Sequence, residues 1–370
     1  FFSHFKMELF DINKILPALL GGGILGTAAG LRYLCNGRIL GISGIYGGLL
    51  RGEQGTSWRF TFTAGMLLGG LILRNSMPSA FYPISGDFPL SRLIGGGLLV
   101  GTGASLGSGC TSGHGVMGLS RLSVRSLVYV CTFMAAGAVV ATSVGSAVAL
   151  TKNLGPSSSP SNAQETLEFS LKSLTAVAVS FFGLTMAAQS GSPSVREGLA
   201  LALELVSGIA TGLALGVGGM LQAKNVAAFL DLRHWDPTLM FVMGGAIMVA
   251  LPVVQLAVMP RINAGAAKEN EPLVASSTND KGPSAEAPTE KMPLVATNKY
   301  VVVTNTTIDA KLILGGVLFG AGWGLSGMCP GPGLINLATP VGFLPVLAFN
   351  AAMAAALALT PAATRLLGFA

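Results

Sequence analysis

Residues 92–123 read RLIGGGLLVGTGASLGSGCTSGHGVMGLSRLS, an apolar stretch that runs into a glycine-rich loop around one cysteine. Residues 92–108 are apolar enough for a membrane helix, and the loop that follows contains Cys110. Glycine lets the backbone turn and approach a ligand closely. A helix that begins inside the membrane directs unpaired amide groups and the positive end of its dipole at whatever lies in front of it. The stretch therefore predicts a span that breaks before Cys110 and a short second helix, capped by Thr111 or Ser112.

The composition of the whole chain is that of a membrane protein. Of its 370 residues, 51% are hydrophobic and 10% are charged, against roughly a quarter charged in soluble domains, and the mean hydropathy is +0.65. A soluble fold would expose much of this apolar surface, so we expect an all-α polytopic membrane protein embedded in the lipid bilayer. The net charge of +6 fits charges that orient the protein and requires no nucleic-acid partner. The first apolar run continues into the body of the protein, so we expect no cleavable signal peptide.

The apolar segments predict how often the chain crosses the membrane. A spanning helix needs about 20 predominantly apolar residues. Nine segments are candidates, several of them short or broken by glycine: 14–34, 59–78, 92–108, 124–150, 167–190, 195–217, 237–259, 308–325 and 342–366. Four further apolar segments are too short to cross: 36–50, 112–122, 221–230 and 331–338. Irregular backbone at membrane depth must be buried in protein or line a cavity, so we expect short or re-entrant helices there.

Residues 262–307 differ sharply from the rest of the chain. The stretch NAGAAKENEPLVASSTNDKGPSAEAPTEKMPLV (263–295) is polar, rich in Ser, Pro, Ala and Glu, and has no helical stripe. Such a segment cannot bury enough apolar surface to offset the entropy lost on ordering. We therefore expect a mostly disordered linker.

The motifs repeat in two halves. CNGRILGISGIYGGLLRG (35–52) and KNVAAFLDLRHWDPT (224–238) each precede an apolar span, and a cysteine loop follows later in each half. The alternative is chance similarity between glycine-rich segments. One connecting span would place the second half upside down relative to the first, as in transporters whose site lies between inverted repeats. The expected division is a first membrane repeat at 1–150, a connecting span within 151–194, a second repeat at 195–261 and 308–370, and the linker at 262–307.

The distribution of positive charge predicts an orientation. With nine spans, eight of the 22 Lys and Arg residues fall on the N-terminal side and the remaining 14 on the other side. Because cytoplasmic segments carry the excess of positive charge, this count places the C-terminus and the 262–307 linker in the cytoplasm. We expect the plasma (inner) membrane.

A second cysteine loop, GWGLSGMCPGPGLINLA (322–338), matches the first in character. Proline is favoured in the first turn of a helix, so we expect a short helix to begin after Cys329. Two such N-termini facing one another would form an anion site without a fixed cation, with the thiols of Cys110 and Cys329 at their tips. A thiol is polarisable and a weak hydrogen-bond donor, which suits a sulfur-containing ligand.

The cysteines as a set indicate neither disulfides nor metal. Cys35, Cys110, Cys131 and Cys329 lie far apart, without a CxxC pair or a Cys/His zinc spacing, so we expect no disulfide framework, no metal and no cofactor. Cys131 lies inside an ordinary span and is interpreted as a small apolar residue. For Cys35 the structural and functional interpretations are evenly balanced.

Three motifs resemble the YeeE/YedE family of sulfur transporters: GSGCTSGHGVMGLSRLSVRSL (107–127), GWGLSGMCPGPGLINLA (322–338) and NGRILGISGIYGG (36–48). The resemblance covers nearly the whole chain apart from the linker. It implies an hourglass-shaped bundle with nine spans and several short inner helices, and thiosulfate uptake along a central path where cysteines contact the ion through S–H···S hydrogen bonds. Cys110 and Cys329 fall on the family's two motif cysteines, and Cys35 falls where a third is expected. Met117 stands where some relatives have Cys.

Several roles stay open at this level. His114 is a proton relay, a ligand of the anion, or the partner of a loop carbonyl, which we favour slightly. Glu204, inside a span, either couples transport to protons or bonds a neighbouring helix. Lys224 either attracts anions at one mouth or is an ordinary interfacial lysine. The predicted substrate-binding residues are Cys35, Asn36, Cys110, Thr111, Ser112, Gly113, His114, Gly115, Cys329, Pro330, Gly331 and Gly333.

We therefore predict a transporter that takes up thiosulfate, or a related sulfur anion, into the cytoplasm. The alternative is a sulfurtransferase-like protein in which a thiolate carries sulfane sulfur as a persulfide to a cytoplasmic acceptor protein. A purely structural membrane protein would give no reason for the two glycine–cysteine loops.

Overall fold

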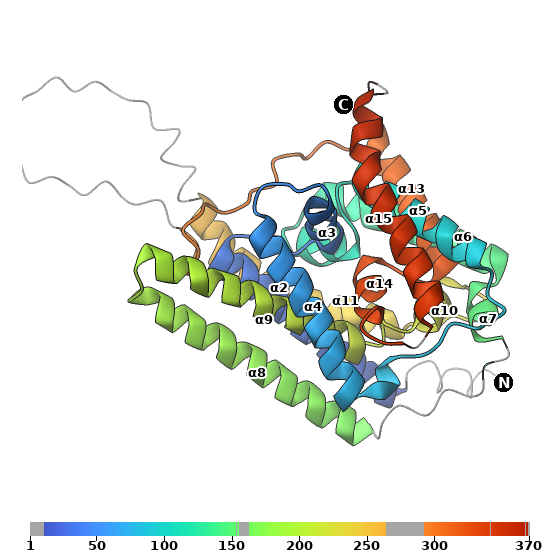
Figure 1. Cartoon of the computed structure of the whole chain (residues 1–370), viewed down its shortest axis with the longest axis horizontal. Coiled ribbons are helices and arrows are strands. Elements are labelled where there is room, and N and C mark those ends of the chain that lie inside the picture. Colours follow the sequence, from blue (N-terminus) through green and yellow to red (C-terminus); the bar gives the residue numbers. More distant parts are fainter. Residues whose placement is uncertain are drawn as a thin grey trace, which may run out of the picture.

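The computed structural model describes residues 11–152, 154, 163–263, 292–340, 342–366 and 368, and within them it is a bundle of helices without strands (Figure 1). Residues 1–10 of the expected first repeat and residues 264–291 of the expected linker lie outside this part. The long helices lie at the nine predicted positions: α2 (Ile12–Asn36), α4 (Thr56–Ser76), α5 (Leu90–Leu106), α6 (Val124–Val144), α8 (Ala163–Gln189), α9 (Pro193–Val217), α11 (Thr238–Pro252), α13 (Ala310–Ser326) and α15 (Phe343–Leu366).

The short helices lie where the short apolar segments predicted them. They are α3 (Ile42–Leu50), η2 (Thr111–Gly118), α10 (Ala223–Leu230) and α14 (Pro330–Asn336). Beyond these, the structure contains the single turn η1 (Pro78–Ala80), the short helix α7 (Ser146–Thr151), and η3 (Val253–Val258), which continues α11. The predicted span 124–150 is divided, because Gly145 adopts φ +59° and ends α6 before α7 begins. A left-handed residue is a common helix terminator.

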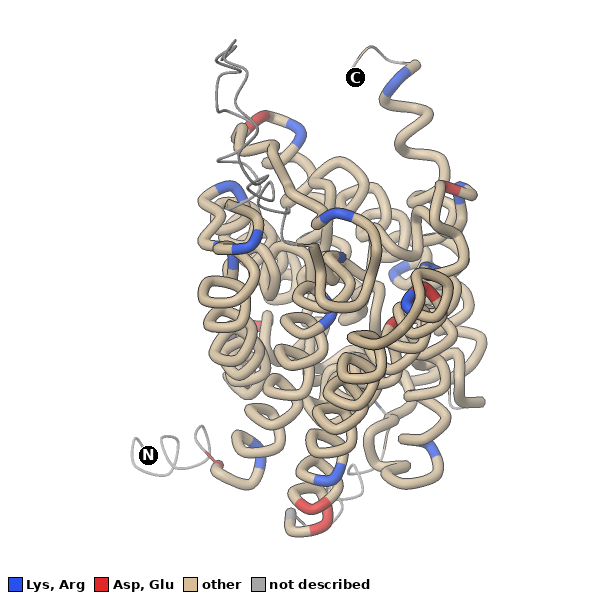
Figure 2. Tube along the Cα trace, turned by 90° about the vertical axis from the view of Figure 1, so that its left-hand side faces the viewer, with Lys and Arg blue, Asp and Glu red and all other residues tan. Residues whose placement is uncertain are grey.

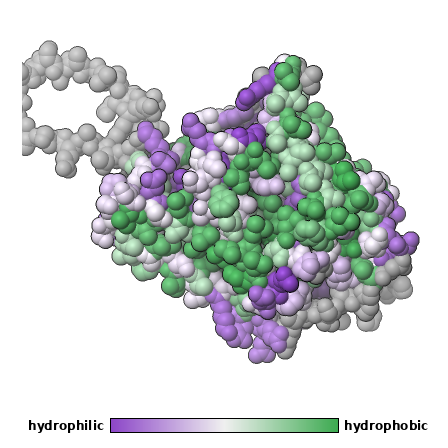
Figure 3. Space-filling view, in the orientation of Figure 1, coloured by the Kyte–Doolittle hydropathy of each residue, from purple (hydrophilic) through white to green (hydrophobic). Residues whose placement is uncertain are grey.

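The described chain contains seven helices that are long and apolar enough to cross a membrane, or eight when α5 and η2 count as one span with a 45° bend. The remaining predicted span, 59–78, corresponds to α4. This helix carries Arg59 and Arg74 and is not among those that are long and apolar enough to cross. Large apolar side chains cover much of the outer surface (Figure 3). Lys and Arg lie at both ends of the bundle and also at several positions between them (Figure 2). The chain is a polytopic α-helical membrane protein.

The two halves of the chain exchange equivalent contacts. The first-half helices α2 and α4 pack on the second-half helices α11 and α9, respectively. In the same way, α5 and α6 pack on α15 and α13. In addition, α2 packs on α9 and α5 packs on α13. Each of the long first-half helices α2, α4, α5 and α6 therefore has a second-half partner.

Glycine allows the backbones to touch at these crossings, as in other membrane helix pairs. A Cβ atom at Gly208 of α9 would lie 2.1 Å from the Phe62 carbonyl oxygen of α4, closer than atoms can pack. The same holds at three other crossings: a Cβ would lie 2.2 Å from Val242 O at Gly22, 2.4 Å from Phe349 O at Gly97 and 2.1 Å from Phe133 O at Gly320.

Residues 292–309 form a strap across one end of the bundle, so the prediction of disorder for 262–307 is wrong for this part. The amides of Leu294 and Val295 donate to the Leu34 and Cys35 carbonyls at the C-terminus of α2, at 3.2 and 2.9 Å. The side chain of Val295 is fully buried. The strap thus satisfies carbonyl groups that a helix end leaves unpaired. Composition suggested disorder because the few apolar residues of the strap are concentrated where they dock.

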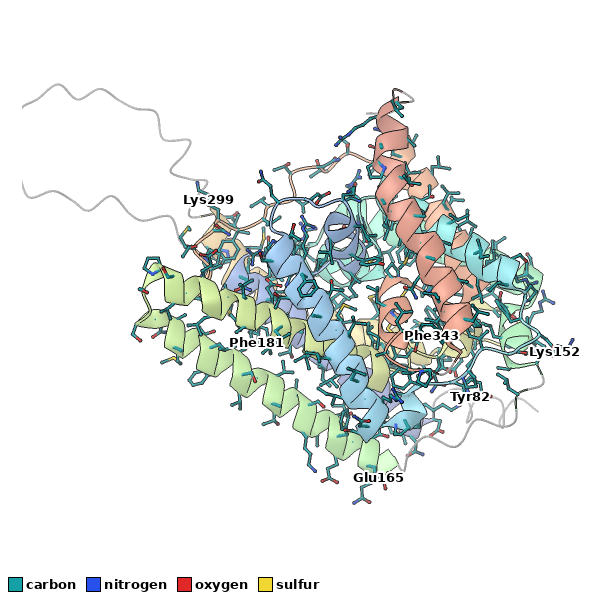
Figure 4. All side chains as sticks on the ribbon, viewed as in Figure 1. Tyr82, Lys152, Glu165, Phe181, Lys299 and Phe343 are labelled. Carbon is teal, nitrogen blue, oxygen red and sulfur yellow. The ribbon has the colours of Figure 1, made fainter. Side chains whose placement is uncertain are left out.

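A tyrosine pair fastens the strap. The Tyr300 hydroxyl donates to the Leu34 carbonyl at 3.0 Å, and the Tyr33 hydroxyl donates to the Val301 carbonyl at 2.9 Å. Burial raises the pKa of the Tyr300 phenol to about 12, so this donor keeps its proton at neutral pH. Figure 4 shows Lys299 of the strap at one end of the bundle and Glu165 at the other.

Candidate functional site

Both cysteine loops open into one central cavity of about 360 Å³. The cavity lies between the two halves, since helices from both supply its walls. Six of the twelve predicted site residues line it: Cys110, Thr111 and Ser112 from the first loop, and Cys329, Pro330 and Gly331 from the second.

The two cysteines occupy the same backbone setting. Each is the last extended residue before a short helix, with φ −128° and ψ −166° at Cys110 and φ −127° and ψ 171° at Cys329. Two residues earlier the chain is left-handed in both loops, at Ser108 with φ +61° and at Gly327 with φ +67°. Left-handed backbone is strained for Ser and ordinary for Gly, and such strain gathers at functional sites. The paired geometry turns both thiols toward the shared cavity.

Hydrogen bonds connect the first cysteine loop to α3. The Cys110 thiol lies 3.3 Å from the Ser112 hydroxyl, whose oxygen accepts from the amide of Ile42 at 3.1 Å. Thr111, which lies between Cys110 and Ser112 in the chain, and Cys329 from the second loop line the same cavity.

No charged side chain is among the described residues that line this cavity. An anion there would be held by amides, hydroxyls and thiols alone. At the start of η2 the first amides have no acceptor in a preceding turn. At the start of α14, Pro330 and Pro332 have no N–H. Of the two N-termini expected to bind an anion, the start of α14 therefore offers fewer amides than the start of η2.

The rest of the wall is apolar and rich in sulfur. Its residues include Met134, Met220, Met240, Met243, Phe229 and Trp323, none of which was predicted as a site residue. Met is polarisable and adapts its shape to a ligand. The only available signal was the spacing of Met240 and Met243 on one face of α11, and a pair of methionines at helical spacing is more often core packing.

Cys35 and Asn36, which were predicted to bind the substrate, are not among the residues that line the cavity. The Cys35 thiol is buried against α8, 3.5 Å from the Thr185 hydroxyl. The Asn36 side chain donates to the Ala200 carbonyl and to Glu204, both at 2.9 Å. Both residues lie at the C-terminal end of α2, under the strap, and their side chains join α2 to α8 and α9.

Four further predicted residues pack around the loops without lining the cavity. His114 lies 3.0 Å from both the Ser126 hydroxyl and the Gly107 carbonyl, so both ring nitrogens have partners within the fold. A Cβ at Gly115 would lie 2.7 Å from the Met243 methyl group. A Cβ at Gly113 would contact only the Gly41 backbone, and one at Gly333 would lie 3.0 Å from the Phe349 ring. Met117 is fully buried.

Glu204 forms a buried ion pair with α2. Its carboxylate accepts from Arg32 Nε at 2.7 Å and from Arg38 Nη1 at 3.2 Å, and both Arg32 and Glu204 have no exposed side-chain surface. Arg32 also donates to the Arg38 and Ile39 carbonyls, which fixes the chain that leads into α3. The bond to a neighbouring helix is therefore the interpretation that the structure supports for Glu204.

Lys224 lines a second, polar cavity of about 260 Å³, and its ammonium lies 3.8 Å from the centre of the Tyr82 ring. Lys14 and Asp236 line the same cavity. Leu239 lines both cavities. Residues 216–219, at the end of α9 and the start of the following turn, border the polar one, while Leu215 and Met220 border the central one. A thin wall thus separates a polar vestibule, which contains two lysines, from the sulfur-lined cavity.

A helical membrane protein with a polar vestibule beside a cavity between its two halves has the architecture of a membrane transport protein. The comparisons agree with this class. A family model described as sulphur transport matches residues 45–140, and a family of unknown function (DUF6691) matches 199–268 and 290–367. The two matches fall in different halves of the chain. No solved structure matches.

The curated relatives are short proteins named as probable transporters from Xylella fastidiosa. One from strain 9a5c is 32% identical over 164 residues, which is 44% of this chain and 90% of the relative. Another, from strain Temecula1, is 41% identical over 130 residues, which is 34% of this chain and 93% of the relative. The chain belongs to the YeeE/YedE-like family of sulfur transporters. It is a membrane transporter of sulfur compounds.

Proposed function

We propose that the chain takes up thiosulfate through the central cavity, and that Cys110 and Cys329 contact the ion there. The observation that carries this proposal is that Cys110 and Cys329, from the two halves of the chain, line one cavity. Thiosulfate has a soft terminal sulfur and three hard oxygens. The thiols and methionines suit the sulfur, and the hydroxyls and amides at the start of η2 suit the oxygens.

The vestibule gives this ion a route to the cavity. Lys14 and Lys224 would attract an anion from water, and the ion would then pass the wall formed by Leu239 and residues 216–219. The absence of fixed positive charge among the described residues of the central cavity suits transport, because a passing ion must also leave.

Uptake of labelled thiosulfate into proteoliposomes tests the proposal. We expect Cys110→Ser and Cys329→Ser each to reduce uptake at least about tenfold, the cost of roughly 1.4 kcal/mol in a transport barrier. Cys131→Ser is the matched control, since Cys131 is an exposed thiol of α6 outside the cavity lining, and it should transport like the wild type. Sulfate in excess should compete poorly. Equal inhibition by sulfate and unlabelled thiosulfate would contradict the role of the terminal sulfur.

The variant Cys35→Ser tests whether Cys35 is a third cysteine on the transport path, as the family resemblance implies. Because the Cys35 thiol contacts Thr185 and not the cavity, a hydroxyl at that place can keep the contact. We expect uptake within about twofold of the wild type, a change of roughly 0.4 kcal/mol. A loss as large as that of Cys329→Ser would place Cys35 on the path.

The persulfide relay remains the second candidate because two thiols share one cavity. In that reaction a thiolate would attack the terminal sulfur and release sulfite, leaving a persulfide on the cysteine. Mass spectrometry of protein incubated with thiosulfate distinguishes the two. We expect no added sulfur on Cys110 or Cys329, whereas a sulfur adduct on either residue, with sulfite in solution, would favour the relay.

A further inference from the structure

The central cavity has a polar end and an apolar side. The polar groups come from η2 and α14, whereas the facing wall is built from Val130 and Met134 of α6, Phe229 of α10, and Met240, Gly244 and Ile247 of α11. The helix α6 packs on α13 and α11 packs on α2. Among the described helices, α6 and α11 share no packing interface of comparable size.

The apolar side opens toward the outer surface. Gly244 is exposed although it lines the cavity, and Met240 is 52% exposed. The neighbouring outer faces carry exposed apolar residues, with Val139 of α6 65% exposed and Met248 of α11 70% exposed. These faces border lipid in a membrane protein of this composition. The space between α6 and α11 is therefore an apolar window that leads from the thiols toward the bilayer.

The cavity is larger than an inorganic sulfur ion requires. Its volume of about 360 Å³ falls in the range of pockets that bury organic ligands, roughly 300–1,000 Å³. A water molecule occupies about 30 Å³ of liquid, and thiosulfate has only five non-hydrogen atoms. Thiosulfate at the polar end would leave the apolar window empty.

We infer that the same cavity also takes short-chain organosulfonates, whose sulfonate group binds at the η2 end and whose carbon chain lies in the window. A sulfonate is thiosulfate with the terminal sulfur replaced by carbon, so it presents the same three oxygens to the hydroxyls and amides. This inference rests on the proposed function for the position of the oxygens. The inference goes beyond the proposed function because it adds a second class of substrate.

The charge of the ligand supports this class. Moving an ion out of water costs free energy that rises with the square of its charge, and the cavity wall has no described charged residue to offset it. A sulfonate carries one negative charge where thiosulfate carries two. Transfer of its carbon chain from water to the apolar wall is favourable, whereas transfer of the oxygens of sulfate to the same wall is unfavourable.

A series of alkanesulfonates tests the inference in proteoliposomes that contain the full chain. Methane-, ethane-, propane- and butanesulfonate compete with labelled thiosulfate. We expect the inhibition constant to fall about fourfold with each methylene, the effect of burying one CH₂ group. A constant that does not change along the series would overturn the inference and leave thiosulfate transport untouched.

A glycine substitution tests the position of the carbon chain. A Cβ at Gly244 would meet nothing within 4 Å, so Gly244→Leu adds a side chain in the window without a backbone clash. We expect the dependence on chain length to disappear in this variant. Gly183→Leu is the matched control, because Gly183 of α8 is also exposed with open space at its Cβ, and it does not line the cavity. A dependence that survives Gly244→Leu would place the chain elsewhere and overturn the inference.

Direct binding provides a readout that does not depend on thiosulfate. Trp323 lines the cavity, so butanesulfonate should change the tryptophan fluorescence of the purified protein in a saturable way. Trp323→Phe should remove that change. If the wild type fails to take up thiosulfate but shows this binding, the proposed function fails and the inference stands. If the same change occurs in Trp323→Phe, or no change occurs at all, the inference fails.

Discussion

Cys110 and Cys329 share one backbone setting, whereas Cys35 and Cys131 lie within the long helices α2 and α6. The first two each come two residues after a left-handed residue and directly before a short helix, and both line the cavity. Cys35 lies inside α2, where the helix turns its thiol toward Thr185 of α8. The chemical role of each thiol is therefore set by the backbone that carries it.

Arg32 and Glu204 form a fully buried ion pair, and we expect this pair to contribute to the stability of the fold. Glu204→Ala would leave Arg32 without its carboxylate where no water reaches it. We expect a loss of about 3–5 kcal/mol, the usual cost of breaking a buried pair on one side. Thermal unfolding of the purified protein in detergent measures this.

The double variant Arg32→Met with Glu204→Met is the control for that experiment. Replacing both members by apolar residues removes the desolvated charges together, so most of the stability should return. Arg38, the other partner of Glu204, is 17% exposed and can turn toward water. A double variant less stable than Glu204→Ala would show that the pair acts through more than its charges.

At the scale of helices, glycine sets how closely the elements pack. Gly208→Val would place a side chain where the Phe62 carbonyl of α4 lies 2.1 Å from a Cβ. We expect the α4–α9 crossing to separate and the protein to lose more than the roughly 1–3 kcal/mol of ordinary overpacking. Gly198→Val on the same helix meets nothing within 4 Å and should retain the wild-type melting temperature. Equal melting temperatures for the two variants would contradict the packing described here.

The strap shows what a compositional prediction misses. Its sequence is polar overall, yet Val295 and Ala296 are buried and their amides both reach the Cys35 carbonyl. Farther along, Arg125 donates to the Thr307 carbonyl and lies 3.8 Å from Asp309, which ties the strap to α6 before α13 begins. A few contacts at specific positions therefore order a segment that its average hydropathy predicts to be disordered.

At the scale of the whole molecule, the spans and short helices could be predicted from the sequence because they depend on local apolar length and on glycine and proline. The shared cavity of Cys110 and Cys329 followed from the repeated loop. The side chains opposite them did not, because nothing in TLMFVMGG (238–245) indicates which helix Met240 and Met243 face. The direction of Cys35 depends on the packing of α8, which no local pattern encodes.

The exchange of equivalent contacts between the halves is what two inverted repeats joined by α8 would produce, and we propose that relation here. The excess of Lys and Arg on the side of the strap leads us to propose that the strap and the C-terminus are cytoplasmic. In this arrangement the vestibule with Lys14 and Lys224 faces the outside, where the proposed uptake of thiosulfate would begin.

Lys224→Gln tests the vestibule. Removing one of its two lysines weakens the attraction for a doubly charged ion before it reaches the cavity. We expect the KM for thiosulfate to rise about threefold to tenfold at low salt, with the maximal rate unchanged, and the difference to shrink as salt screens the charge. Lys172→Gln is the control, since Lys172 is 73% exposed on α8 and pairs with Glu168. An equal rise in KM for both variants would mean that total charge matters and the vestibule does not.

The most direct test of the central claim is to bridge the two cavity thiols and measure transport. In the variant Cys35→Ser with Cys131→Ser, only Cys110 and Cys329 can react with a short bifunctional thiol reagent. The account predicts that the reagent links the two cysteines within one chain, that thiosulfate uptake then stops, and that reduction of the bridge restores it. Uptake that continues through the bridged protein, or thiols that react singly and never bridge, would contradict a shared path between Cys110 and Cys329.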